Sequence, residues 1–155
     1  MKPILKRRPD VRLAKLIRLP GGKTIESIEA DVDRRMDSLK GACIIAVQDK
    51  VQEIVRQAGV MPRPPSREDI GRIYGLSNEL IGLAGVADLE DAGRAAMSFC
   101  RLLDGCRNGK AWTAAPFDVH LGALQLLAQP DGELDETARD HMIQGLNAVA
   151  RRALA

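Results

Sequence analysis

Apolar residues recur at steps of three and four along most of the chain, which is the period of an amphipathic α-helix. The longest series follows Thr24, a predicted N-cap, and ends before Gly59 and a proline-rich stretch at residues 62–65. Its apolar positions are Ile25, Ile28, Val32, Met36, Leu39, Cys43, Val47, Val51, Ile54 and Ala58. This spacing predicts one helical face sustained over about nine turns.

Four more helices are expected after this one. Ser66 is a predicted N-cap of a helix that runs to about Ala87, with acidic residues in its first turn. The others are expected over residues 88–106, from Pro116 to a break at residues 130–132, and over residues 135–153. Their apolar stripes hold Leu89, Ala92, Ala96, Phe99 and Leu103, then Val119, Leu121, Leu124 and Leu127, then Met142, Leu146 and Val149. Strand-like alternation is absent from the sequence, so the predicted fold is all-α, an antiparallel up-and-down helical bundle.

Charge separates the first 23 residues from the remainder. They hold eight lysines and arginines against Asp10 alone, whereas acidic residues outnumber basic ones in the rest of the chain. A Pro-Gly-Gly break at residues 20–22 follows the basic stretch. We therefore expect a basic arm at residues 1–23 and a helical bundle at residues 24–155. The arm suits nucleic acid or an anionic membrane surface, or else it is a solvated tail or docks on its own acidic domain.

The cysteines and the hydropathy favour a cytoplasmic protein. The chain has three cysteines, an odd number, and it opens on charged residues instead of an apolar signal segment. We expect reduced, inert thiols, no metal site at zinc spacing, no cofactor, and no contact across a membrane, because no apolar stretch approaches about 20 residues.

A stripe of glycines marks the second expected helix. Its core face is expected to hold Ile70, Ile73, Leu76, Leu80, Leu83 and Ala84. The opposite side holds Gly71, Gly75, Asn78, Gly82 and Gly85, which we call the glycine stripe. Each interior glycine costs a helix roughly 0.5 to 1 kcal/mol relative to alanine. Two explanations stand side by side: a partner approaches the bare backbone, with Arg72 and Glu79 at the rim, or the first helix or the arm packs against it.

The same helix resembles a known family. Residues 73–85 read IYGLSNELIGLAG, and together with residues 98–103 (SFCRLL) they resemble histidine phosphotransfer domains of two-component phosphorelays. In that family a histidine accepts the phosphoryl group, a lysine three residues later supports it, and a glycine leaves room for a receiver domain. The matching positions here are Asn78, Ile81 and Gly82, so the glycine is kept and both chemical residues are lost. The resemblance implies a four-helix bundle, here with an extra terminal helix.

A closer likeness, which spans most of the chain from Leu13 to Leu127, is to the CheE family of bacterial chemotaxis clusters. It rests on residues 13–24 (LAKLIRLPGGKT) and residues 112–127. This resemblance implies a two-component or chemotaxis setting in a bacterium.

The residue chemistry argues against a relay. An asparagine amide is too weak a nucleophile to accept phosphate, and Ile81 supplies no cation to the transferring phosphoryl oxygens. Neither His120 nor His141 has a glycine-cleared surface beside it, so we expect neither to be a phosphoacceptor. Catalytic residues are therefore not predicted.

The leading hypothesis is a non-catalytic adaptor that binds the receiver domain of a response regulator, with a histidine kinase as a further candidate partner. Its contact residues would be Gly71, Arg72, Gly75, Asn78, Glu79, Gly82 and Gly85. Alternatives are a nucleic-acid- or membrane-binding protein that acts through the basic arm, and a self-associating structural protein. An enzyme with a small-molecule substrate ranks last, because paired carboxylates, a phosphate-binding loop and a Ser-His-Asp order are all missing from the sequence.

Overall fold

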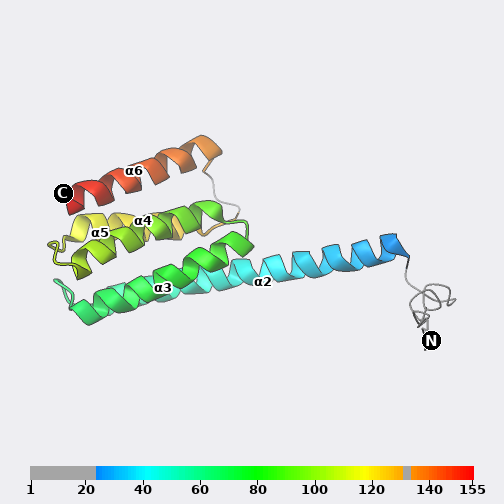
Figure 1. Ribbon diagram of the computed structural model, residues 1–155, viewed down its shortest axis with the longest axis horizontal. Helices are drawn as coiled ribbons and strands as arrows, with labels where there is room; N and C mark the ends of the chain where they lie inside the picture. The colour runs from blue at the N-terminus through cyan, green and yellow to red at the C-terminus, as the bar shows by residue number, and fades with distance from the viewer. Residues whose placement is uncertain (1–23, 131–133) are drawn as a thin grey trace, which may run out of the picture. The chain divides into compact units, whose positions relative to one another are not determined.

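The computed structural model of the protein describes residues 24–130 and 134–155. Within these ranges all regular structure is helical, which confirms the all-α class. Figure 1 shows the five helices: α2 (Ile25–Val60), α3 (Arg67–Val86), α4 (Glu90–Arg107), α5 (Ala114–Leu127) and α6 (Glu136–Leu154).

The chain divides into two compact units, residues 1–36 and residues 37–155. The expected basic arm, residues 1–23, lies outside the described residues. The described part of the first unit is residues 24–36, which include the first turns of α2, and every side chain there except Asp31 is exposed. The second unit contains the rest of α2 and the four other helices.

Side-chain caps set the helix starts close to their expected places. The Ser66 hydroxyl accepts from the Asp69 amide at 3.1 Å, and the Asp69 carboxylate accepts from the Ser66 amide, which completes a capping box for α3. Asp135 caps α6 in the same way, through the Ala138 amide at 2.7 Å. The fourth expected helix begins at Ala114 instead of Pro116, because a proline is tolerated within the first turn, where amides lack helical partners.

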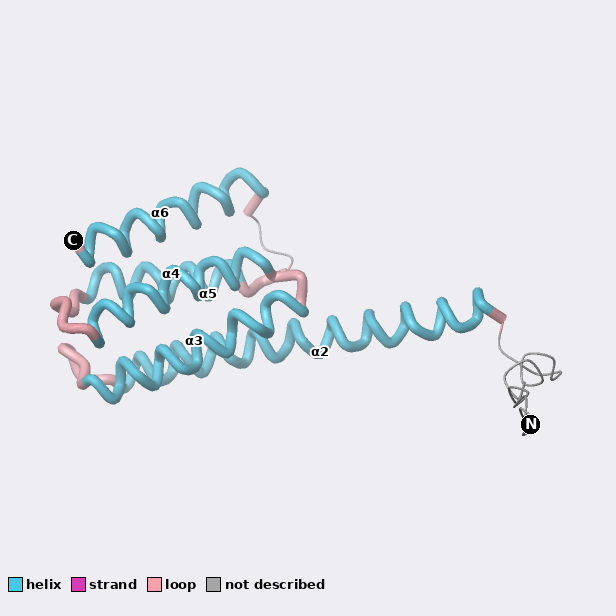
Figure 2. The backbone as a smooth tube through the Cα atoms, in the orientation of Figure 1, coloured by secondary structure: helices cyan, strands magenta, loops and turns pink. Residues whose placement is uncertain are grey.

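Helix α4 forms the centre of the second unit, where it contacts α3, α5 and α6 (Figure 2). All five residues of its expected stripe are buried. Phe99 packs edge-on against Phe117 of α5 with 5.1 Å between ring centroids, and it stacks on the His120 ring at 5.5 Å. The chain has few aromatics, and these three rings pack together between α4 and α5.

Two expected stripes are rotated in the structure. On α6 the buried residues are Ile143, Leu146 and Ala150, while Met142 and Val149 are only half-buried. On α5 Val119 is half-exposed, and the core positions are Phe117, His120, Ala123, Leu124 and Leu127. Short helices rich in apolar residues offer more than one candidate face, and the packing partner selects among them.

The long apolar series of α2 is buried over only part of its length. Val47, Val51, Ile54 and Ala58 lie in the core, whereas the positions from Ile25 to Leu39 are exposed. The prediction of a single helix with one apolar face is therefore confirmed, and the structure adds that only the second half of this face is buried. No helix in the described part of the chain is long and apolar enough to cross a membrane.

Candidate functional site

The glycine stripe faces outward on α3. Ile70, Ile73, Leu80 and Ala84 are buried on the opposite side, as expected, while Leu76 and Leu83 are half-buried. Ser77 is the core residue that the periodicity missed, and its hydroxyl donates to the Ile73 carbonyl at 2.8 Å. This local bond removes the cost of burying a hydroxyl and lets a polar residue occupy the inward face.

The four glycines of the stripe have no close neighbour. A Cβ atom placed on Gly71, Gly75, Gly82 or Gly85 would meet nothing within 4 Å. Among the described residues, no other helix packs against the stripe, which removes α2 as the explanation for its small residues. The arm is the other internal candidate, and it lies outside the described part of the chain.

Asn78 is exposed in the middle of the stripe, and ion pairs border it on one side. Glu79 accepts from Lys50 of α2 at 2.5 Å. Arg72 lies 3.5 Å from Glu68 and 3.7 Å from Asp69 on its own helix. Exposed pairs of this kind contribute little to stability, so these charges are free to exchange partners when another protein approaches.

An aromatic residue borders the other side of the stripe. Tyr74 of α3 is half-buried, and the Arg107 guanidinium at the end of α4 lies 4.9 Å from its ring centroid. Ile81 stands on the same side, where its carbonyl approaches Gly93 of α4. Tyr74 and Ile81 were not predicted to border the glycine stripe. The spacing offered a signal, because Tyr74 and Ile81 are seven residues apart and lie between the stripe and the core face.

His120 is enclosed in the core, beyond the reach of any phosphoryl donor. It is 0% exposed. Its Nδ1 lies 2.7 Å from the Pro116 carbonyl, which only accepts, so Nδ1 carries the proton and Nε2 accepts from the Ser98 hydroxyl at 3.0 Å. Burial lowers the pKa of His120, and the bond to the Pro116 carbonyl opposes this only in part. The ring is therefore a neutral structural group, and the Ser98–His120 pair, although spaced like a nucleophile and base, has no access to substrate.

The remaining reactive side chains form no centre. His141 is exposed on α6. All three cysteines are free, and burial raises the pKa of the Cys100 thiol to about 11, which keeps it protonated and unreactive. In the described ranges, no group of three histidine, cysteine, aspartate or glutamate side chains could hold a metal ion.

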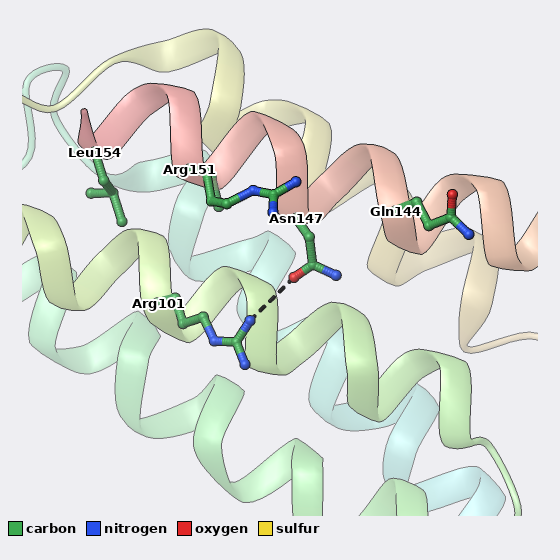
Figure 3. A pocket seen from close by; sticks show the side chains of 6 residues that line it. Arg101, Gln144, Asn147, Arg151 and Leu154 are labelled. Carbon is green, nitrogen blue, oxygen red and sulfur yellow. Dashed lines mark hydrogen bonds between the residues drawn. The ribbon is translucent and has the colours of Figure 1, made fainter.

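A polar cleft lies between α4 and α6, away from the glycine stripe. Its volume is about 450 Å³, and Figure 3 shows the side chains of Arg101, Gln144, Asn147 and Arg151 around it. Arg101 donates to the Asn147 side-chain oxygen at 3.3 Å. Two guanidinium groups and two amides suit an acidic group. This cleft was not predicted, although Gln144, Asn147 and Arg151 recur at helical spacing along α6.

No protein-family model, curated protein or solved structure matches this chain.

Proposed function

We propose that the protein is a non-catalytic adaptor that binds the receiver domain of a response regulator in a bacterial two-component or chemotaxis pathway. The glycine stripe of α3 is the docking surface, with Arg72, Asn78 and Glu79 as its polar contacts. One observation carries the proposal: the stripe glycines face open space, although each lowers the stability of α3.

The openness of the stripe supports docking over internal packing. Helices α2 and α4 flank α3 through Lys50 and Ile81, yet neither approaches the glycines. A helix whose backbone is bare along one side lets another backbone come close. Asn78 offers both a donor and an acceptor in the middle of that surface.

The chemistry of the site supports binding without phosphoryl transfer. Asn78 is the polar residue at the centre of the glycine stripe, and its amide does not accept a phosphoryl group. Ile81 is apolar and lies toward α4, so no cation stands at the position where the resembling family has its lysine. His120 is buried and His141 lies on another helix, so neither supplies the missing nucleophile.

An adaptor of this kind acts by covering the surface of the receiver domain to which it binds. While the stripe is bound, the receiver's phosphoacceptor aspartate is shielded from kinases and from true phosphotransfer proteins. The ion pairs at the rim can reorganise toward the partner at small cost, because the Glu79, Arg72 and Glu68 side chains are exposed in the free protein.

The test is a binding measurement against receiver domains from the same organism, each with and without a beryllofluoride phosphoryl mimic. Gly75→Arg and Gly82→Arg are expected to abolish binding, because a long side chain would stand in the docking plane. Both should keep the fold, since the space above each glycine is empty.

A matched control is Gly145→Arg on α6, where the glycine is also exposed and has nothing within 4 Å of an added Cβ. This variant should bind like the wild type. Equal binding by all three variants would refute the docking surface. Stable phosphoryl transfer to the wild-type chain from a charged receiver would refute the non-catalytic role.

The basic arm supplies the competing proposal, binding to nucleic acid or to an anionic membrane. Such binding would fall steeply with salt and would disappear when residues 1–22 are deleted. Receiver binding through α3 should survive that deletion, so one truncated protein separates the two functions.

A further inference from the structure

The first half of α2 presents an apolar stripe that no described residue covers. Its five residues, which we call the α2 stripe, are Ile25 (74% exposed), Ile28 (49%), Val32 (51%), Met36 (60%) and Leu39 (52%). Single exposed apolar residues are ordinary, but a contiguous row on one helical face is typical of an interaction surface.

The α2 stripe continues a row of core residues on the same helix. After Leu39 the series passes through half-buried Cys43 to Val47 and Val51, which are 0% and 2% exposed. The mean step is about 3.7 residues, close to the eleven-residue repeat that keeps an apolar row on one side of a nearly straight helix. Among the described residues, the apolar row is thus buried from Val47 onward and exposed from Ile25 to Leu39.

The spacing of the α2 stripe is symmetric about Val32. Ile28 and Met36 lie four residues to either side of it, and Ile25 and Leu39 lie seven residues to either side. A second copy of α2 turned end to end therefore places Val32 against Val32, Ile28 against Met36, and Ile25 against Leu39. Every apolar position meets an apolar position in this single register.

The charges on this part of α2 favour the same orientation. Residues 25–33 hold four acidic side chains and no basic one, whereas residues 34–40 hold Arg34, Arg35 and Lys40 against Asp37 alone. Reversing the second copy sets each acidic half against a basic half, while a parallel pair would set like charges together. In the reversed register Glu26 comes level with the partner's Lys40 to within two residues.

We propose that two copies of this chain associate through the α2 stripe, as an antiparallel helix pair with its two-fold axis at Val32. The contact is isologous, so each copy uses the same surface and the assembly closes as a dimer. Lys40 already pairs with Asp88, but this is an exposed contact that can exchange with the second copy. The overlap is short, which predicts a weak, concentration-dependent dimer.

Cysteine cross-linking of the full chain tests the geometry. Val32→Cys is expected to form a disulfide-linked dimer under mild oxidation, because the two copies of this residue meet at the axis. Met36→Cys is expected not to, since its two copies lie about 12 Å apart along the helix axes in the antiparallel register. A mixture of Ile28→Cys and Met36→Cys proteins should cross-link again.

The wild type, with its three native cysteines, is the background control. If the Val32→Cys protein and the Met36→Cys protein each formed a disulfide-linked dimer when tested separately, the two helices would be parallel, and the proposal would be overturned. A monomeric mass for the wild type throughout a dilution series, with no cross-link in any variant, would overturn it too and would assign the α2 stripe to the arm or to another protein.

A charge substitution tests the apolar contact itself. Val32→Asp should shift the protein to a monomer in analytical ultracentrifugation, with unchanged helical content, because Val32 is half-exposed and does not belong to the core formed by the described residues. The matched control is Ile45→Asp, since Ile45 lies on the same helix, is 61% exposed and faces away from the stripe. A dimer that survives Val32→Asp, or that is lost equally in both variants, would refute the α2 stripe as the interface.

Discussion

Helices α3 and α4 both carry glycines, but the two sets lie in opposite surroundings. The glycines of the α3 stripe face open space, whereas Gly93 and Gly105 of α4 stand where another helix passes close by. An added Cβ on Gly93 would lie 3.4 Å from the Ala84 Cβ atom of α3. The difference teaches that a small residue in a helix has two physical meanings, close packing within the molecule or an open surface, and that only its neighbours decide between them.

The largest loss of stability is expected for a substitution at Gly93. Replacing this buried glycine with leucine adds four carbons to the α3–α4 contact, where the first would already touch the Ala84 Cβ atom at 3.4 Å and the three beyond it must displace neighbours. We expect a loss of about 3 kcal/mol in the free energy of unfolding. Urea denaturation followed by circular dichroism measures it, and a stability equal to the wild type would mean that α3 and α4 pack less closely than described.

The inner side of α4 also holds Ser98, whose partner is His120. His120→Ala is expected to cost about 2 kcal/mol at pH 7.5, because it leaves a cavity beside Phe99 and deprives the Ser98 hydroxyl of its partner. By contrast, Asn78→Ala on the outer side of α3 should leave the unfolding free energy nearly unchanged, since Asn78 is exposed.

The His120 pKa gives this prediction a pH signature. Burial lowers the folded-state pKa below the unfolded value of about 6.5, so the unfolded chain binds a proton first as the pH falls. The stability is therefore full above about pH 6.5 and declines as the pH drops toward the folded pKa. Denaturation at pH 7.5 and pH 5.5 should show this decline in the wild type and a smaller one in His120→Ala, with His141→Ala as the control.

Gly105 offers a milder test of the packed side. An added Cβ would crowd Leu154, whose Cγ atom would lie at 3.2 Å, but Leu154 is near the end of α6 and its side chain is flexible. Gly105→Ala is therefore expected to cost about 1 kcal/mol or less. Truncating the neighbour in the double variant Gly105→Ala/Leu154→Ala should remove the clash, and a thermodynamic cycle that shows no coupling would contradict the contact.

Substitutions in the glycine stripe itself are expected to increase stability slightly. Gly75→Ala and Gly82→Ala should each raise the unfolding free energy, by up to about 1 kcal/mol, because alanine favours the helix and meets nothing within 4 Å. Thermal melts of both variants check this. A fall in stability would show that the stripe is covered, and it would favour the arm as the occupant.

Sequence periodicity, caps and breakers determined the helices themselves. The capping box at Ser66, the Asp135 cap and the proline-rich stretch before α3 act over a few residues, so local chemistry was enough to place the helix ends within about two residues. The position of the glycine stripe opposite the core face of α3 was also predicted, because the apolar residues on that face are numerous enough to define it, but the sequence left undecided whether another segment packs against the stripe.

Tertiary structure alone decided which apolar rows are buried and which small residues are free. The α2 series has the same period throughout, yet among the described residues it is buried only from Val47 onward. His120 has no distinguishing sequence neighbours; it is buried where Phe99 and Ser98 of α4 pack against it, and this burial lowers its pKa. The burial and the pKa of a residue depend on atoms that the fold brings together from distant parts of the chain. They therefore cannot be predicted from the residues next to it in the sequence.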